Sequence, residues 1–140
     1  MSHKVTTVWK ENMLLESDNP SGHTVLLETT PDFGGTGKGL SPKALMLSSL
    51  SGCTALDVLS LLKKMRVTID SFKVEVTAEM TKEHPKYYNK VSVDYYFTGK
   101  ELKKDKIEKA VNLSEERYCG VFEMFRKFAE VRTKIYYSEA

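Results

Sequence analysis

The fold of this chain is decided by one stretch, Ser41-Pro42-Lys43-Ala44-Leu45-Met46-Leu47-Ser48-Ser49-Leu50-Ser51-Gly52-Cys53-Thr54-Ala55-Leu56-Asp57-Val58. Ser41 suits an N-cap and Pro42 the first helical position, so the sequence predicts a long helix that opens here and runs to about Arg66. Its leucines, methionines and valines spread around most of the circumference, which is typical of a helix buried on nearly all sides. In a chain of 140 residues, this pattern indicates burial by a second subunit.

The segments around this helix predict one α+β domain that covers residues 1–140. Before the helix, short alternating runs between turn formers predict strands over residues 5–9, 13–16 and 23–29. After it, the sequence predicts a hairpin of strands 71–80 and 88–97, helices over 103–118 and 121–128, and a closing strand over 131–137. No repeat and no interdomain linker divides the chain.

Composition and charge exclude several classes of protein. The 21 basic and 19 acidic residues leave a net charge of +2, which is too small to favour nucleic acid or an anionic membrane as a partner. The start of the chain has no apolar signal core, and Ser, Thr, Gly and Asp interrupt the apolar stretch 45–62, so no membrane span is expected. A cytoplasmic location is the default expectation, and thiols stay mostly reduced there.

Two familiar site patterns are incomplete in this sequence. The glycine-rich run 34–39 looks like a phosphate-binding loop, but Asp32 occupies the first glycine position and Gly39 replaces the hydroxyl residue that would hold magnesium. The run is therefore expected to be a flexible loop. The three histidines show no zinc spacing, and nothing singles out one of them as the partner of a catalytic cysteine: His3, His23 and His84. Neither a metal nor a bound cofactor is expected.

Two cysteines, Cys53 and Cys119, are the only ones in the chain. Small residues surround Cys53, and Asp57 lies four residues later on the same helix face. A carboxylate in such an apolar helix needs a hydrogen-bond or charge partner. Cys119 lies where one helical pattern stops and the next begins. A redox-active pair is one interpretation; an inert core cysteine is the other, because free cysteine is among the most buried residue types.

The sequences around both cysteines resemble those of the OsmC/Ohr superfamily. The first is the helix from Pro42 to Arg66, with Ser-Gly-Cys-Thr-Ala-Leu-Asp-Val at its centre, and the second is Ser114-Glu115-Glu116-Arg117-Tyr118-Cys119-Gly120-Val121. The order of predicted elements agrees along nearly the whole chain, and the resemblance is closer to the OsmC-like branch than to the organic hydroperoxide reductases. It implies an OsmC-like fold with antiparallel sheets around a long buried central helix. It also implies an intertwined homodimer with two sites at the subunit boundary.

The same resemblance implies unequal roles for the two thiols in a peroxidase of oxidative-stress defence. Cys53 would be the peroxidatic cysteine, whose thiolate attacks an organic hydroperoxide or hydrogen peroxide and becomes a sulfenic acid. Cys119 would be the resolving cysteine, which condenses with that sulfenic acid to a disulfide. A dithiol such as a lipoyl protein or thioredoxin would then reduce the disulfide. No metal or bound prosthetic group is required.

The chain departs from the superfamily pattern at the groups that activate the cysteine. The hydroperoxide reductases pair their cysteine with an arginine from the N-terminal β region, held by a glutamate just after the helix-opening proline. This chain has no arginine before Arg66, and Lys43 follows the proline. Lys38, Lys43 and Arg117 are the candidate sources of positive charge. Two functions therefore stay open: a thiol peroxidase, and a non-catalytic dimer that binds a small apolar ligand or senses redox state.

Overall fold

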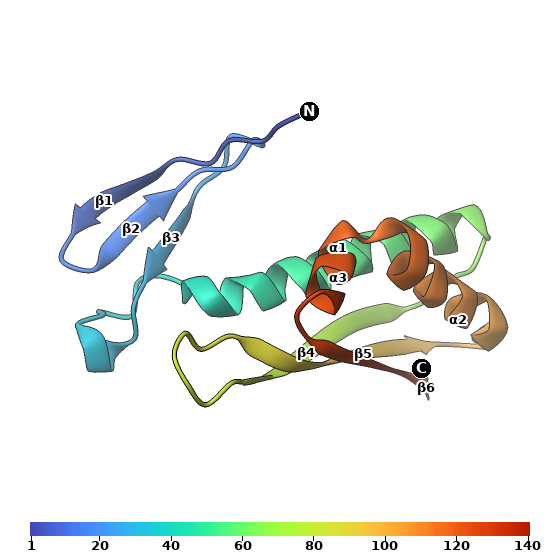
Figure 1. The fold of residues 1–140 in the computed structure, drawn as a ribbon. Helices are drawn as coiled ribbons and strands as arrows, with labels where there is room; N and C mark the ends of the chain where they lie inside the picture. The colour runs from blue at the N-terminus through green and yellow to red at the C-terminus, as the bar shows by residue number, and fades with distance from the viewer. The chain divides into compact units, whose positions relative to one another are not determined.

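Residues 1–140 are all described by the computed structural model of this chain (Figure 1). They form two compact units, Met1–Met46 and Leu47–Ala140, joined within the long helix. The prediction of a single domain over residues 1–140 stays a prediction.

The first unit is a three-stranded antiparallel sheet in the order β1-β2-β3. Its strands are β1 (Thr7–Glu11), β2 (Leu14–Ser17) and β3 (Val25–Glu28), and a 3₁₀ turn (Pro31–Phe33) follows them. The three predicted strands are confirmed, each beginning one or two residues later than expected. Asn12 makes the tight turn between β1 and β2 at φ 46°, a left-handed conformation that asparagine tolerates better than most residues.

The glycine-rich run 34–39 is organised around the carboxylate of Glu28. The backbone N–H and the hydroxyl of Thr36 both donate to Glu28 Oε2 over 2.7 Å. The backbone N–H groups of Lys38 and Gly39 donate to Oε1 over 2.8 and 3.1 Å. The donors that a phosphate would need are thus taken by an internal carboxylate, which agrees with the rejection of a phosphate-binding loop. The sequence did not reveal this partner of the loop.

These hydrogen bonds hold the pKa of Glu28 at about 2, below its ordinary value of 4.5, with the Thr36 hydroxyl as the largest cause. A depressed carboxyl pKa contributes stability above pH 4.5 that is lost as the pH falls toward 2. We expect Glu28→Gln to flatten this acid-side decline, while Glu11→Gln on exposed β1 leaves it unchanged. Urea unfolding followed by fluorescence of the single tryptophan, Trp9 in β1, measures the effect between pH 2 and 5. Equal slopes in all three proteins would contradict the assignment.

The second unit contains the remaining elements, and the structure confirms the predicted order of helices and strands. The central helix α1 spans Pro42–Lys64 and reaches this unit from Leu47 onward. It ends where Arg66 takes a left-handed φ of 60°, close to the predicted end. After it come β4 (Ser71–Met80), β5 (Tyr88–Gly99), α2 (Lys104–Leu113), a π-helical turn (Ser114–Tyr118), α3 (Gly120–Arg126) and β6 (Glu130–Glu139).

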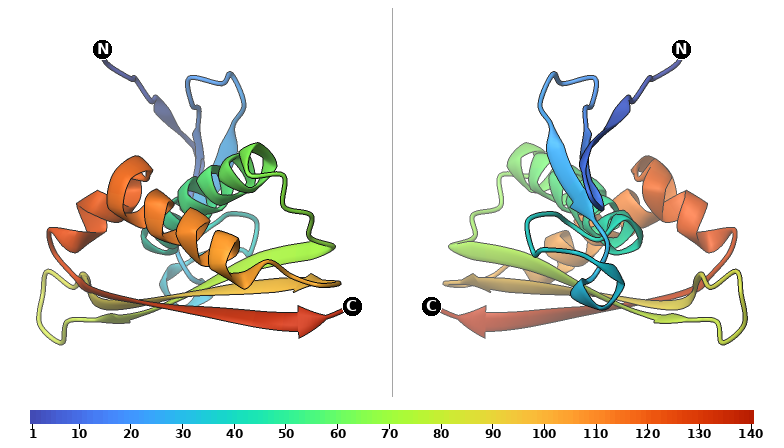
Figure 2. Two further views of the ribbon diagram at one scale, coloured as in Figure 1. Left: turned by 90° about the vertical axis from the view of Figure 1, so that its right-hand side faces the viewer. Right: turned by 90° about the vertical axis from the view of Figure 1, so that its left-hand side faces the viewer.

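The sheet of the second unit has the order β4-β5-β6, and it is mixed. β4 and β5 form the predicted antiparallel hairpin, with Phe72 opposite Phe97. β5 and β6 are parallel, with Val93 opposite Thr133, so the expectation of antiparallel sheets is wrong for this pair. The physical reason is the connection: α2 and α3 cross over the sheet, and a crossover returns the chain to run beside β5 in the same direction. Figure 2 shows α2, α3 and the part of α1 from Leu47 onward on one face of this sheet.

The core of the second unit lies between that sheet face and the helices. Its largest buried side chains include Tyr95, Phe97, Phe122 and Phe125. α1 contributes one buried stripe at intervals of four residues: Leu50, Thr54, Val58 and Leu62. One chain buries only this stripe, and other apolar side chains of α1 face outward, so the prediction that a second subunit helps to bury the helix on nearly all sides stays a prediction. The clearest of these outward side chains are Leu56 and Leu59, with 70% and 45% of their surface exposed.

By length and composition alone, α1 would be able to cross a membrane. Its most apolar 18-residue window has a mean hydropathy of 1.6, and 22% of that window is buried within the chain. Core helices of water-soluble proteins meet the same two criteria. Two polar groups on α1, the Asp57 carboxylate and the Thr54 hydroxyl, are hydrogen-bonded to other elements of the second unit. These contacts favour a core helix over a membrane-spanning one.

Candidate redox site

The structure brings Cys53 and Cys119 together inside the second unit. Both are free thiols; Cys53 is half-buried on α1, and Cys119 is buried, with 3% of its surface exposed. Their sulfurs and a carboxylate oxygen of Asp57 all lie within 4.8 Å of one another. Because a disulfide bond is about 2.05 Å long, the sulfurs need to approach by no more than about 2.8 Å to form one. The two predicted site residues are thus neighbours.

A π-helical turn brings Cys119 to α1. The wider turn Ser114–Tyr118 follows α2, and the Cys119 N–H closes it by donating to the Ser114 carbonyl over 2.8 Å. Cys119 then takes an extended conformation, and its sulfur caps α3 by accepting the N–H of Phe122 over 3.3 Å. Single π turns occur frequently at functional sites. The predicted break between two helices is confirmed, and the break fixes the direction of the thiol.

The environment of Cys119 favours the neutral thiol. Burial is the largest cause that raises its pKa well above the ordinary value of 9.0, and the hydrogen bond with Cys53 raises the pKa further. The negative charge of Asp57 acts in the same direction, and only the Phe122 N–H opposes it. Cys119 is therefore a shielded sulfur whose environment favours the protonated form.

Asp57 has the partner that the sequence predicted it to need. The Ser114 hydroxyl donates to Asp57 Oδ2 over 3.1 Å. None of the ion pairs in the structure involves Asp57, so this carboxylate faces two thiols and one neutral donor with no cation within ion-pair distance. Arg117, one of the candidate cations, is exposed and forms no ion pair. Lys38 and Lys43 belong to the first unit, and their candidacy stays a prediction.

A buried row of hydroxyls connects Asp57 to a second carboxyl, Glu115. From Ser114 the row passes to the hydroxyl of Thr54 over 2.8 Å and from there to that of Tyr95, again over 2.8 Å. Tyr95 Oη in turn lies 2.8 Å from Glu115 Oε2, which also accepts the hydroxyl of Thr133 over 2.8 Å. Sequence reasoning missed these residues, which come from α1, β5, β6 and the π turn. The one sequence feature that could have indicated them is Thr54, a polar residue at a position where the stripe on α1 is otherwise apolar.

The hydrogens in this row can be counted. Three hydroxyls, those of Tyr95, Thr54 and Ser114, lie between the two carboxyls and take part in four contacts. Each hydroxyl has one hydrogen, so with both carboxyls ionised one contact lacks a hydrogen. A proton on one carboxyl completes the row. Burial is the largest influence on Glu115 and raises the pKa of this carboxyl, whereas its hydrogen bonds with Tyr95 and Thr133 act in the opposite direction.

The raised pKa of Glu115 predicts how stability depends on pH. A raised carboxyl pKa contributes stability that is fully present below the unfolded value of 4.5 and is lost as the pH rises through the folded value. Above pH 4.5 the free energy of unfolding of the wild type should therefore decline in a way that Glu115→Gln removes. Urea titrations followed by circular dichroism between pH 4.5 and 7.5 measure it, with Glu108→Gln on the exposed side of α2 as the control. A parallel decline in the Glu115 variant would show that Glu115 binds no extra proton in the folded state.

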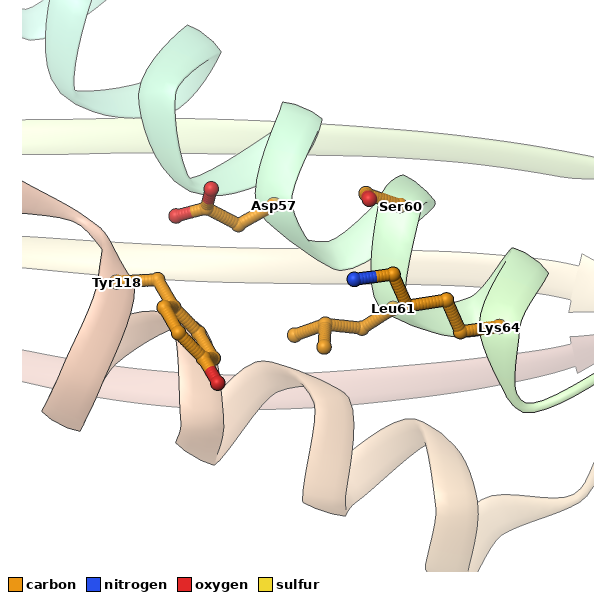
Figure 3. Close-up of a pocket in the computed structure, with 5 residues that line it drawn as sticks. All are labelled: Asp57, Ser60, Leu61, Lys64 and Tyr118. Atoms are coloured by element: carbon orange, nitrogen blue, oxygen red, sulfur yellow. The ribbon is translucent and has the colours of Figure 1, made fainter.

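A pocket of about 290 Å³ opens beside Asp57. It is lined by Asp57, Ser60, Leu61 and Lys64 from successive turns of α1, and Tyr118 faces them from the π turn (Figure 3). The pocket joins polar groups to an apolar wall, and Lys64 is the one cation that lines it. Small molecules thus have an approach to the carboxylate that adjoins the two thiols.

Comparison with known proteins agrees with this description. The OsmC-like protein family matches residues 35–134. Protein YhfA of Escherichia coli K12 is 32% identical over 124 residues, which cover 88% of this chain and 89% of YhfA. A hypothetical protein from Aquifex aeolicus has the same fold, with a TM-score of 0.87, 24% identity and coverage of 100% and 98% of the two chains.

A more distant structure carries a functional description of its own. The organic hydroperoxide resistance protein OsmC of Legionella pneumophila, described as a predicted redox protein, shares the fold with a TM-score of 0.70 and 15% identity; each chain is covered to 97%. At that identity the likeness concerns the fold. The family match and the relationship to YhfA, in contrast, extend over most of the sequence. The chain therefore belongs to the OsmC-like protein family.

Proposed function

We propose that this chain is a two-cysteine peroxidase that reduces organic hydroperoxides or hydrogen peroxide with electrons from a dithiol. The observation that carries the proposal is the pair of free thiols, Cys53 and Cys119, with sulfurs within 4.8 Å of each other. The family context supports it, since the OsmC/Ohr proteins include peroxidases. Free thiols also suit the reducing cytoplasm, where such an enzyme would act in oxidative-stress defence.

The reaction divides into three balanced steps. The Cys53 thiolate attacks one peroxide oxygen; the O–O bond breaks, and the departing alkoxide takes a proton and leaves as an alcohol (or water). The resulting Cys53 sulfenic acid condenses with the Cys119 thiol to form a disulfide and one water. A lipoyl or thioredoxin-like dithiol then reduces this disulfide by exchange and is itself oxidised to a disulfide.

The environments of the two sulfurs support unequal roles. Cys53 is half-buried, whereas Cys119 is shielded and its pKa is raised. The attacking sulfur has to be reached by peroxide, which fits the less buried Cys53 better. The resolving sulfur has only to reach its neighbour. We assign Cys53 as the peroxidatic and Cys119 as the resolving cysteine on this basis.

The pocket beside Asp57 supports an organic peroxide as substrate. Leu61 and the ring of Tyr118 offer apolar contacts for a hydrocarbon group, and Ser60 and Lys64 offer donors for oxygen atoms. Lys64 also supplies positive charge beside Asp57 in a chain that lacks the superfamily arginine. We therefore add Lys64 to the cations that favour a thiolate at this site.

A turnover assay tests the proposal. The reduced protein is mixed with cumene hydroperoxide or hydrogen peroxide and excess dihydrolipoamide, and peroxide loss is followed over many equivalents. The wild type should consume peroxide catalytically, and Cys53→Ser should not. Slow oxidation of one equivalent without turnover would overturn the peroxidase and favour the redox-sensing or ligand-binding alternative.

We further propose that two copies of the chain form a homodimer through the outward apolar side chains of α1. The support is the contrast between the apolar character of α1 and its burial: its most apolar 18-residue window has a mean hydropathy of 1.6, and one chain buries 22% of that window. Leu56 and Leu59 lie on that outward side. A second copy would cover them, which meets the expectation of an all-round buried helix.

Leu56→Glu should dissociate this dimer. Burying a leucine contributes about 1.5–3 kcal/mol, and a two-fold interface contains the substitution twice. The dissociation constant should thus rise about 100-fold or more, since each 1.4 kcal/mol is a factor of ten. Light scattering during size exclusion measures the change, with Met124→Glu on the exposed side of α3 as the control. A dimer that survives Leu56→Glu unchanged would place the interface elsewhere.

A further inference from the structure

The three atoms gathered at the redox site are also donors for a metal ion. Cys53 and Asp57 lie one helical turn apart on α1, a spacing that places two ligands on one helix face. Cys119 approaches from the end of the π turn. Two thiols and one carboxylate oxygen lie mutually within 4.8 Å. No spacing motif in the sequence reveals this set, because its third member comes from a distant segment.

The spacing of these atoms is close to that of a zinc site. Zn–S bonds of about 2.3 Å and a Zn–O bond of about 2.0 Å in a tetrahedron place the ligand atoms roughly 3.5–3.8 Å apart. The observed upper limit of 4.8 Å exceeds this by about 1 Å, which side-chain rotations are able to close. The donor types decide the metal: two sulfurs favour Zn²⁺ over Mg²⁺ and Ca²⁺, which take oxygen ligands.

The charge of the site favours a cation. Asp57 has one neutral donor, the Ser114 hydroxyl, and no ion pair. A divalent ion between the carboxylate and the two sulfurs would balance the charge that no lysine or arginine pairs with. The ion would also supply, at the two cysteines, the positive charge that the superfamily arginine provides in the hydroperoxide reductases.

The groups behind the donors are arranged as supports for ligands. Ser114 holds the Asp57 carboxylate and is itself held by Thr54, over 2.8 Å between hydroxyl oxygens. The Phe122 N–H donates to the Cys119 sulfur. Such outer hydrogen bonds orient metal ligands and raise the affinity of the site. The pocket beside Asp57, which Asp57 lines and the two cysteines do not, would give an ion access from the carboxylate side.

We propose that the reduced protein binds one zinc ion per chain through Cys53, Asp57 and Cys119, with a fourth coordination position open to the pocket. Binding converts both thiols to thiolates and releases two protons, while Asp57 binds as the carboxylate. The bound ion occupies both cysteines, so it excludes disulfide formation and competes with peroxide. This inference does not depend on peroxide turnover, because metal binding is measured on the reduced protein alone.

Titration with cobalt, a spectroscopic probe for zinc sites, tests the proposal on untagged, reduced protein. A thiolate-to-cobalt charge-transfer band should grow to saturation at one ion per chain and disappear on addition of zinc. Cys53→Ser and Cys119→Ser should each lose about half or more of the band. No charge-transfer band in the wild type would overturn the site.

Variants of Asp57 test whether the carboxylate is a ligand or whether the two thiols bind the metal without it. Asp57→Asn should weaken cobalt and zinc binding at least tenfold, while Asp70→Asn, the same change at an exposed position after α1, should leave it unchanged. Ser114→Ala keeps all three donors and should lower the affinity by about 10- to 100-fold through loss of the supporting hydrogen bond. Equal affinity in the Asp57, Ser114 and Asp70 variants would overturn the three-ligand site.

Two measurements on the wild type keep the proposal testable if a variant fails to fold. Zinc should raise the melting temperature of the reduced protein, because it binds the folded state. It should also slow the alkylation of Cys53 and Cys119 by iodoacetamide, read by mass spectrometry. Zinc that changes neither the melting temperature nor the alkylation rate would contradict the proposal.

Discussion

Peroxide-treated Cys119→Ser protein is expected to stop at a sulfenic acid on Cys53. The wild type should instead lose two hydrogens per chain and form a disulfide, because the two sulfurs lie within 4.8 Å. A serine hydroxyl cannot condense with a sulfenic acid in the way that a thiol does, so the oxygen stays on Cys53 and is available to dimedone. Intact-mass spectrometry distinguishes the two products directly: one added oxygen in the variant, and two lost hydrogens in the wild type. Turnover with a dithiol should fall sharply in the same variant.

The reciprocal variant serves as the control for the direction of the reaction. Cys53→Ser leaves Cys119 as the remaining thiol, buried and with a raised pKa, so it should stay unmodified under the same treatment. A sulfenic acid that forms on Cys119 in Cys53→Ser, at the rate seen on Cys53 in Cys119→Ser, would reverse the assigned roles. A wild type that adds oxygen without forming a disulfide would show that the two sulfurs do not close the remaining gap.

Local sequence pattern was enough to predict most of the fold. Alternation located β4 at its observed bounds and β5 to within two residues of its end, since each strand has one face on the core. Ser41 and Pro42 located the start of α1. The parallel pairing of β5 and β6 was missed, because it depends on the path of α2 and α3 over the sheet and not on any local pattern.

The site was predictable to a lesser depth. The two cysteines and the need of Asp57 for a partner followed from the sequence. The row of Thr54, Tyr95 and Glu115 did not, because hydroxyls and a carboxyl from separate elements meet only after folding. Tyr95 in particular occupies an inward position in the alternating pattern of β5, where an ordinary core aromatic is expected. Its hydroxyl shows a second role only when the contacts of its oxygen are known.

Tyr95→Phe isolates that second role and is expected to destabilise the protein by about 1–3 kcal/mol. The change keeps the buried ring, which stacks near Phe72 at 6.4 Å between centroids, and removes only the hydroxyl that bridges Thr54 and Glu115. Glu115 then keeps only the Thr133 hydroxyl on that oxygen. Tyr95→Ala should cost about 3–5 kcal/mol, because it also empties the ring's volume in the core. Urea unfolding gives both values.

Tyr136→Phe is the matched control, because its ring on β6 also stacks on an aromatic neighbour, Tyr96, at 4.8 Å, but is partly exposed. A surface change of this kind should stay within about 0.5 kcal/mol. The Tyr95 hydroxyl lowers the pKa of Glu115 by donating to its carboxylate, so Tyr95→Phe should raise that pKa further and steepen the decline in stability above pH 4.5 that is ascribed to Glu115. A loss of stability that is independent of pH would mean that the Tyr95 hydroxyl has no influence on the pKa of Glu115.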